Sequence, residues 1–213
     1  MAKPIVYGPR FSTYVRSTLL ALEEKGAAYD VHEVNILEGA HQTPEHLARH
    51  PFGKVPAFSH DGFDLYEVSA ILQYVDAVFP GASLQSEDAK ARARMHQVMG
   101  IIDSYAYPAF ITHVFIPRVV APMLGGETDE AAVKASLPAA EKSVNALERL
   151  IGSNKFVAGD ALSLADLHLA PIYDYFSQTP EGQSILANAP GLRRWWDGIK
   201  DRKSVVKTRP QLG

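Results

Sequence analysis

Strand-like segments are confined to about the first 80 of the 213 residues, and this confinement limits the possible folds more than any other feature of the sequence. In that region, short apolar runs bounded by turn residues alternate with stretches of helical periodicity. After residue 87 the sequence holds helical patterns and almost no strand signal. The chain is therefore expected to form a mixed α/β region followed by an all-helical region.

The first region predicts the element order βαβαββα. Strands are expected at residues 4–7, 29–36, 54–59 and 63–66, and helices at 14–25, 39–49 and 69–79. A start in the order strand, helix, strand predicts a parallel pair. The dipeptide Asp61-Gly62 between the last two strands is typical of a tight hairpin. Together these features predict a mixed four-stranded sheet with helices on its faces, which is the thioredoxin-like arrangement.

The boundaries follow from the change in pattern. Residues 1–80 are expected to form the thioredoxin-like domain, residues 81–87 a linker, and residues 88–213 an all-helical C-terminal domain. Helices are expected in the second domain at about residues 88–124, 128–151, 164–177, 181–187 and 191–202. Prolines inside the first two of these helices should kink or interrupt them; they are Pro108, Pro117 and Pro138.

The composition excludes several classes of function. The chain has no cysteine, so disulfides, thiolate metal sites and a nucleophilic protein thiol are impossible. A net charge of -3 gives no basic surface for nucleic acid or for an anionic membrane. No cluster of His, Asp or Glu has the spacing of a metal site, and no bound metal is expected. Without a secretory signal or a long apolar run, the protein is expected in the cytoplasm.

Five segments, in this order along the chain, resemble motifs of the cytosolic glutathione S-transferases. They are YGPRFSTYVRSTLLALEEKG at 7–26, HPFGKVPAF at 50–58, LYEVSAILQYV at 65–75, SLADLHLAP at 163–171 and LRRWWDGIKDR at 192–202. The resemblance covers nearly the whole chain and is nearest to the serine-type phi class, in a bacterial-like form. It implies the same two-domain fold, with glutathione as co-substrate and no metal.

In that family the enzyme's chemical task is to stabilise a thiolate. A free thiol of this kind has a pKa of about 8.5, so only roughly 3% is ionised at pH 7. A hydroxyl group that donates to the sulfur near a helix N-terminus favours the ionised form. The resemblance implies that Ser12 is this donor, with Thr13 in reserve and Tyr7 as a weaker candidate. From the residues alone, Ser12 is equally suited to capping the first helix.

The resemblance also implies the residues that hold glutathione. Val55 should pair through its backbone with the cysteinyl residue, next to a cis peptide bond before Pro56. The γ-glutamyl end should meet Glu67, with Val68 in the place where the family has a serine or threonine, and Ser69 as a substitute for that hydroxyl. The glycyl carboxylate is expected to contact His41, Gln42 and Lys54.

A second substrate, an apolar electrophile, is expected to bind between the two domains. The residues expected to line its pocket are Phe11, Tyr105, Phe110, His113 and Phe115. At helical spacing, most such residues are ordinary core residues, so only two or three of them are expected to face a ligand. Phe52 resembles an aromatic residue that some classes insert into a partner subunit, and it implies a homodimer; packing within its own subunit is the alternative.

The leading functional hypothesis is a glutathione transferase that conjugates the thiolate to an apolar electrophile, with reduction of organic hydroperoxides as a side activity. The alternative is a protein of the same fold that binds ligands or partners without catalysis, which the missing hydroxyl at Val68 favours. A thiol–disulfide oxidoreductase is disfavoured because the chain has no cysteine.

Overall fold

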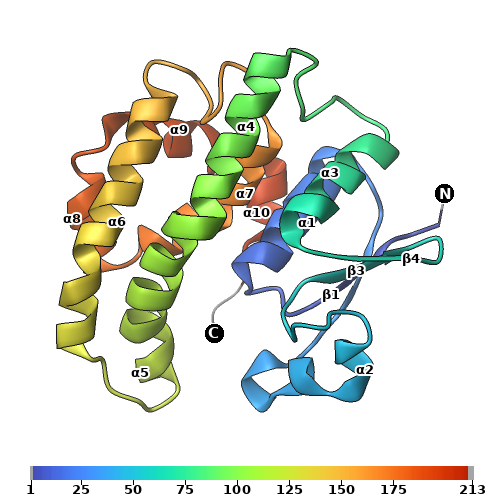
Figure 1. Ribbon diagram of the computed structural model, residues 1–213, viewed down its shortest axis with the longest axis horizontal. Coiled ribbons are helices and arrows are strands. Elements are labelled where there is room, and N and C mark those ends of the chain that lie inside the picture. Colours follow the sequence, from blue (N-terminus) through green and yellow to red (C-terminus); the bar gives the residue numbers. More distant parts are fainter. Residues whose placement is uncertain (1, 211–213) are drawn as a thin grey trace. The chain divides into compact units, whose positions relative to one another are not determined.

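The computed structural model describes residues 2–210, which form two compact units (Figure 1). The first unit contains residues up to Leu84 together with the segment that begins at Asp201, and the second runs from Gln85 to Lys200. The segment after residue 200 was expected to belong to the helical domain. In the structure this segment packs with the first unit because its helix lies against the first helix of the chain.

The sheet of the first unit has the predicted mixed topology. Its strands are β1 (Ile5–Tyr7), β2 (Asp30–His32), β3 (Ala57–His60) and β4 (Phe63–Tyr66), in the order β2-β1-β3-β4. β1 pairs in parallel with β2, while β3 is antiparallel to both β1 and β4. Asp61 and Gly62 have φ values of 51° and 78°, so both adopt the positive φ that a type I′ hairpin requires.

The helical elements of this unit are α1 (Thr13–Glu24), η1 (Ile36–Glu38), η2 (Ala40–Gln42), α2 (Pro44–Leu47), α3 (Val68–Val78) and α10 (Lys203–Thr208). α1 and α3 pack against each other, and they contact β1 and β4 respectively. Their inner faces and the sheet bury Val6, Leu19, Phe58, Leu72 and Val75 completely. The strand expected at residues 29–36 ends early, at His32, and the Asn35 side chain accepts a hydrogen bond from the Leu37 amide at the start of η1.

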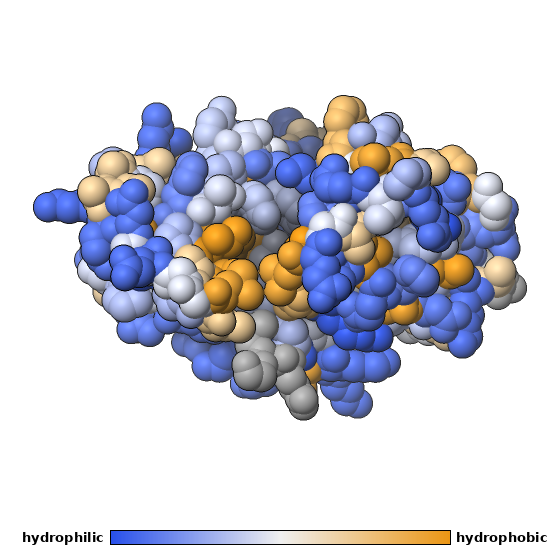
Figure 2. Space-filling view, turned by 90° about the horizontal axis from the view of Figure 1, so that it is seen from below, coloured by the Kyte–Doolittle hydropathy of each residue, from blue (hydrophilic) through white to orange (hydrophobic). Residues whose placement is uncertain are grey.

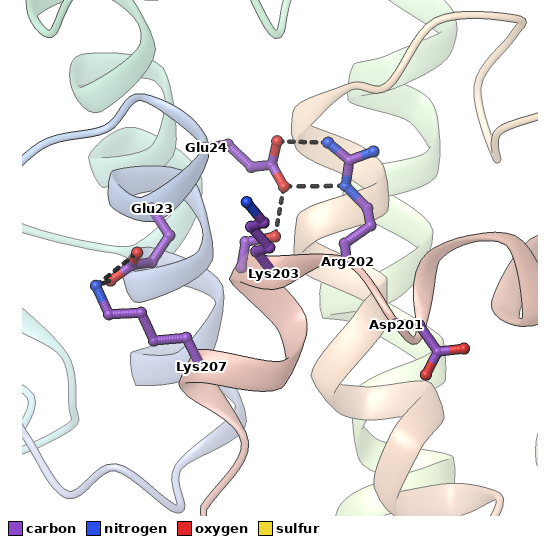
Figure 3. A pocket seen from close by; sticks show the side chains of 7 residues that line it. Glu23, Glu24, Asp201, Arg202, Lys203 and Lys207 are labelled. Carbon is purple, nitrogen blue, oxygen red and sulfur yellow. Dashed lines mark hydrogen bonds and ion pairs between the residues drawn. The ribbon is translucent and has the colours of Figure 1, made fainter.

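A network of carboxylates and cations joins α10 to the end of α1 (Figure 3). Arg202 donates two hydrogen bonds to the Glu24 carboxylate, at 3.0 and 2.6 Å, and the Ser204 hydroxyl donates to the same group. Lys207 pairs with Glu23, which also accepts a 2.6 Å hydrogen bond from the Tyr29 hydroxyl. Burial, together with the hydrogen bond to the Glu23 carboxylate, raises the pKa of Tyr29 to about 12.

Helix α7 (Leu164–Phe176) forms the centre of the second unit, and all of its residues are buried. The surrounding elements are α4 (Ala89–Ile101), η3 (Ile102–Ala106), η4 (Pro108–Val120), α5 (Ala121–Met123), α6 (Glu130–Ile151), α8 (Pro180–Leu186) and α9 (Pro190–Ile199). α4 and η4 both contact α7. The last helix expected from the sequence, at residues 191–202, corresponds to α9, whereas α10 was not predicted. α6 continues through Pro138 without interruption.

The segment from α4 to α5 is helical throughout, but its turns widen in the middle. In η3 and η4 the hydrogen bonds span five residues, as at Tyr107 N–H to Ile102 O and Ala121 N–H to Ile116 O. Pro108 and Pro117 lack the N–H group that a regular α-helix would use at those positions. Buried residues recur here at intervals of four and five, at Ile102, Ala106, Phe110 and Phe115. Pro108 and Pro117, which were expected to kink or interrupt this helix, therefore lie where its pitch changes, and they do not interrupt it.

Within residues 2–210, no helix is both long enough and apolar enough to span a membrane. Hydrophilic residues cover most of the face in Figure 2. Exposed large apolar side chains of the two units include Leu37, Phe52, Phe63, Tyr105, Met123, Leu124 and Val206.

Asp166 organises the start of α7 and the neighbouring loop. Ser163 caps the helix, and the Asp166 carboxylate accepts hydrogen bonds from the amide and the hydroxyl of Ser163 at 2.8 and 2.7 Å. The same carboxylate accepts bonds of 2.9 Å from the Val157 amide and from Trp195 Nε1. Burial raises the pKa of this carboxyl, while the four hydrogen bonds oppose that rise. The capping box predicted from the sequence is present.

Replacing Asp166 by Ala should lower the free energy of unfolding by about 3 kcal/mol or more, because buried donors lose their acceptor. Urea denaturation measures the change. Asp197→Ala is a suitable control, since Asp197 is exposed and forms an ion pair with Lys200 directly after α9. The control should change stability by less than about 0.5 kcal/mol. An equally small loss in Asp166→Ala would contradict the assigned role.

Glu24→Gln should weaken the attachment of α10 by about 1 kcal/mol, since the bidentate pair with Arg202 is only partly shielded from water. Burial raises the pKa of Glu24. The hydrogen bonds from Arg202 and Ser204 lower that pKa and together outweigh burial, so the net pKa lies below the ordinary value. This contribution is therefore present at neutral pH and is lost as the pH falls through the lowered pKa.

Urea unfolding at neutral and acidic pH tests the Glu24 prediction. Asp201→Asn provides the matched control, because the Asp201 side chain points away from the network in Figure 3. If both variants lose the same stability, the Glu24 pair does not hold α10 in place.

Candidate functional site

Ser12 lies at the N-terminal end of α1, directly after the loop that follows β1. Its backbone is extended, and its Oγ atom accepts a 3.5 Å hydrogen bond from the Val15 amide, so it caps the helix. A hydroxyl that accepts in this way keeps its own proton for another acceptor. The two roles considered for Ser12 are therefore compatible, and the positive end of the helix dipole favours an anion at this position.

The two other hydroxyl candidates are less accessible or differently placed. Thr13 is only 4% exposed, as the first residue of α1. Tyr7 is half-buried at the end of β1, where its ring lies 5.3 Å from that of His32 and the Arg49 guanidinium lies 4.6 Å above it. Of these three residues, Ser12 alone both lies at a helix N-terminus and is not buried.

Gly8 brings the loop before α1 close to the segment before β3. Its φ is 148°, and a Cβ atom there would lie 2.6 Å from a methyl carbon of Val15 and 3.0 Å from the Cβ of Val55. The Val55–Pro56 peptide bond is cis, as predicted. Val55 is half-buried and lies just outside the strand pairing, which begins at Ala57. This arrangement holds Val55 next to the loop that carries Ser12.

Glu67 occupies an unusual backbone conformation at the start of α3. Its φ of 70° and ψ of 111° are strained for a residue with a side chain. The Glu67 carbonyl accepts hydrogen bonds from the amides of Ala70 and Ile71, while its own side chain is exposed. Val68 is 7% exposed and Ser69 is half-buried. The first amide groups of a helix have no partner within it, and such a position suits a carboxylate ligand.

The residues expected near the glycyl carboxylate come from η2 and the loop before β3. Gln42 donates a 3.2 Å hydrogen bond to the Gly53 carbonyl, which ties η2 to that loop. Lys54 has an exposed side chain, and its carbonyl contacts His46 Nε2 at 2.7 Å. His41 is half-buried, and its Nδ1 atom has no hydrogen-bond partner within residues 2–210.

An aromatic and imidazole cluster lies beside these loops, and Phe52 is the one member that was singled out from the sequence. It consists of His46, His50, Phe52 and Tyr66, with the His50 ring 4.9 Å from that of Tyr66 and 6.3 Å from that of Phe52. Phe52 is 69% exposed, whereas His46 and His50 are buried. In the sequence, the sign of this cluster was two histidines spaced four residues apart, next to a short helix. Their burial could not be predicted because it depends on β4, which is distant in sequence.

The five residues expected around an electrophile have different surroundings. Phe110 stacks on Phe176 at 4.1 Å, and Phe115 stacks on Tyr175 at 4.4 Å, so both are interior residues of the helical unit. Tyr105 and His113 are exposed on η3 and η4, and Phe11 is half-buried beside Ser12. Within residues 2–210, no group of three or more His, Asp or Glu residues is arranged to hold a metal ion.

The strain at Glu67 leads to a stability prediction. Glu67→Gly should raise the free energy of unfolding by up to about 1 kcal/mol, because glycine adopts a positive φ without steric cost. Glu67→Ala is the matched control, since it removes the carboxylate but keeps the Cβ atom. Chemical denaturation should rank the glycine variant above the alanine variant; equal stability of the two would mean that the Cβ atom causes no strain.

Comparison with known proteins gives this geometry a family context. Residues 2–77 match the glutathione S-transferase N-terminal domain, and residues 101–203 match the glutathione S-transferase C-terminal domain. The chain is 34% identical over 207 residues to glutathione S-transferase 1 of Zea mays, covering 97% of this chain and 96% of the relative.

Two solved structures share the fold over nearly the full length. Glutathione transferase F7 from Populus trichocarpa is 29% identical, with a TM-score of 0.87 over 96% of this chain and 97% of that protein. Glutathione S-transferase I from maize, solved in complex with an atrazine glutathione conjugate, is 31% identical, with a TM-score of 0.84 over 97% and 96% of the two chains. The chain therefore belongs to the glutathione S-transferase family, and its relatives are plant enzymes of the phi class.

Proposed function

We propose that the protein conjugates glutathione to an apolar electrophile and that Ser12 stabilises the attacking thiolate. The observation that carries this proposal is the geometry of the Ser12 hydroxyl, whose oxygen accepts from the Val15 amide at the N-terminus of α1. That bond orients the hydroxyl and leaves its proton for the glutathione sulfur. The helix dipole adds to the stabilisation of the negative charge.

The reaction is a nucleophilic substitution or addition at carbon. The glutathione thiol loses its proton to solvent, and the thiolate forms a carbon–sulfur bond. In a substitution, the bond between that carbon and the leaving group breaks, and the leaving group departs with the electron pair. In an addition, the π bond at that carbon breaks, its electron pair moves to the neighbouring atom, and the product takes up a proton from solvent. Lowering the thiol pKa by about two units gives mostly thiolate at neutral pH.

The proposed binding mode for glutathione uses three segments of the first unit. Val55, held beside Gly8 and next to Pro56, is proposed to pair with the cysteinyl backbone. Glu67 is proposed to pair with the γ-glutamyl ammonium, and the amides of Val68 and Ser69 with the γ-glutamyl carboxylate. The glycyl carboxylate is proposed to contact side chains of the η2 region and the following loop, which are His41, Gln42 and Lys54.

The remaining assignments extend the same proposal. The first unit is proposed to bind glutathione and the second to supply side chains for the electrophile, among which Tyr105 and His113 are exposed. Reduction of a hydroperoxide is proposed as a side activity, in which two glutathione thiols become a disulfide and the hydroperoxide becomes an alcohol and water.

Phe52, at 69% exposure, is proposed to contact a partner subunit in a homodimer. The cytoplasmic location expected from the sequence is proposed as well.

A binding protein without catalysis is the second candidate. Val68 favours it, because this residue has no hydroxyl and is buried, so its side chain offers nothing polar to a γ-glutamyl carboxylate. The lost contact is worth about 1 kcal/mol, or roughly five- to tenfold in affinity.

Ser12→Ala should lower kcat/KM for conjugation to a chloronitrobenzene by about 10- to 100-fold, which is the effect of removing one hydrogen bond to a charged atom. Glutathione should still bind, and the rising limb of the pH–rate profile should move toward about 8.5, the pKa of a free thiol. Thr13→Val and Tyr7→Phe, each of which removes one neighbouring hydroxyl group, serve as controls and should keep most of the activity.

Calorimetric titration of glutathione into the wild-type protein separates the two candidates. Binding together with a large loss of activity only in Ser12→Ala supports the proposed mechanism. A large loss in Tyr7→Phe instead would transfer the donor role to Tyr7. Absence of both binding and turnover would contradict the enzyme hypothesis and favour the second candidate.

A further inference from the structure

His46 is a buried histidine on α2 whose ring reaches the loop before β3. The residue is only 4% exposed, and its ring stacks on that of His50 with the centroids 6.4 Å apart. Its amide donates a 3.4 Å hydrogen bond to the Thr43 hydroxyl, and its carbonyl accepts bonds of 2.9 Å from the amides of Arg49 and His50. Both the backbone and the ring of His46 are therefore held in place.

The His46 ring makes a hydrogen bond to the backbone of that loop. Its Nε2 atom lies 2.7 Å from the Lys54 carbonyl oxygen. A carbonyl oxygen can only accept, so Nε2 is the ring nitrogen that carries a proton and donates. A buried carbonyl without a donor is costly, and this bond therefore holds the Lys54 carbonyl oxygen in one direction.

The Lys54 carbonyl belongs to the same peptide group as the Val55 amide. This group is planar and trans, so its C=O and its N–H point in opposite directions. Holding the carbonyl oxygen therefore sets the direction of the Val55 N–H. Within residues 2–210, no acceptor pairs with this N–H, because the strand pairing begins only at Ala57. The Val55 amide is thus a fixed backbone donor that is available to a ligand.

The two preceding peptide groups of the loop are tied down in the same way. The Gly53 amide donates a 2.9 Å hydrogen bond to the His50 carbonyl, and the Gly53 carbonyl accepts one of 3.2 Å from the Gln42 side chain. Three consecutive peptide groups are therefore each held at one end. The bond from His46 is the last of the three and is the one that bears directly on Val55.

We propose that His46 is a positioning residue for glutathione, which holds the Lys54 carbonyl and thereby directs the Val55 N–H at the carbonyl of the cysteinyl residue. This inference rests on the proposed glutathione site. His46 acts through the peptide group between it and the ligand. Its removal therefore weakens glutathione binding and leaves the chemical step at Ser12 unchanged.

His46→Leu tests the inference, because it removes the donor and keeps an apolar side chain of similar size. The KM for glutathione and its calorimetric dissociation constant should rise about five- to tenfold, the effect of one lost hydrogen bond. The kcat at saturating glutathione and the pH–rate profile should not change. His46→Gln, whose side-chain amide donates to the same carbonyl, should restore most of the affinity. An equal loss of affinity in both variants would overturn the inference.

His60→Leu is the matched control, because His60 is a second buried histidine of the first unit, 3% exposed. Its Nε2 atom lies 3.2 Å from the Ala2 carbonyl oxygen, at the far end of β3 from Val55. This variant should lose stability as His46→Leu does, but it should keep the wild-type KM for glutathione. The same rise in KM in both variants would indicate general loosening of the unit and contradict a positioning role.

A Lys54→Ala background separates the backbone of Lys54 from its side chain. If His46 acts through the peptide group, His46→Leu should lower kcat/KM at low glutathione by the same factor with and without the Lys54 side chain. An effect that disappears in Lys54→Ala would mean that His46 positions that side chain, and it would overturn the route through Val55.

A further measurement does not depend on glutathione. NMR of the His46 ring nitrogens in the wild-type protein should show the proton on Nε2. The Val55 amide signal should move in His46→Leu and return toward its wild-type position in His46→Gln, which lacks the ring as well. A proton on Nδ1 alone, or equal movement of the Val55 signal in both variants, would overturn the inference.

Two outcomes keep this inference separate from the proposed function. If the wild-type protein binds no glutathione, the proposed glutathione site fails, and the NMR results still decide whether His46 sets the direction of the Val55 amide. If His46→Leu unfolds, His46→Phe replaces it, because phenylalanine keeps a flat ring against His50 and has no donor.

Discussion

The candidate site depends on the close packing of Gly8 between Val15 and Val55. A Cβ atom at Gly8 would approach a Val15 methyl carbon to 2.6 Å, so this position tolerates only a hydrogen. The end of β1 can thus pass between the first turn of α1 and the segment before β3. The helix start that carries Ser12 and the backbone of Val55 are thereby held on either side of the same residue. A side chain at Gly8 would separate the hydroxyl group from the backbone groups proposed to bind the same ligand.

The part of the candidate site at the start of α3 depends on a different constraint, which is the change of chain direction at Tyr66 and Glu67, between β4 and α3. The strained φ of 70° at Glu67 turns the chain from β4 into α3 while its side chain remains exposed. Tyr66 contacts His50 on the other side of this corner. The exposed Glu67 side chain, which is proposed to bind ligand, stands directly before the first amide groups of α3 because Glu67 adopts a backbone conformation that few side chains tolerate.

Much of the first unit could be predicted from local sequence. The dipeptide Asp61-Gly62 specifies its hairpin turn through the positive φ of both residues, and the parallel β1–β2 pair follows from the strand–helix–strand order. The capping box at Ser163 and Asp166 is similarly local. The position of Ser12 at a helix start was also predicted from the residues, whereas the cis peptide bond before Pro56 and the chemical roles of Ser12 and Val55 were predicted only from the resemblance to a family.

Features that depend on distant contacts could not be predicted in this way. The wide turns of η4 occur where Phe110 and Phe115 stack on α7, and periodicity alone indicates only a helix with prolines. The same two residues were expected near a ligand because aromatic side chains suit both a pocket and a core. Burial of His50 depends on Tyr66, and the packing of α10 on α1 depends on the pairing of Arg202 with Glu24.

The return of α10 to the first unit has a consequence for biosynthesis. The ribosome releases the sheet, α1 and α3 first, then the whole of the second unit, and only afterwards the residues that pair with Glu23 and Glu24. During translation the first unit must therefore exist without its last helix, with two acidic side chains and the surface that covers Val205 exposed to water. Completion of that unit by α10 must therefore wait until the whole second unit has been synthesised, although the sheet of the first unit precedes that unit along the chain.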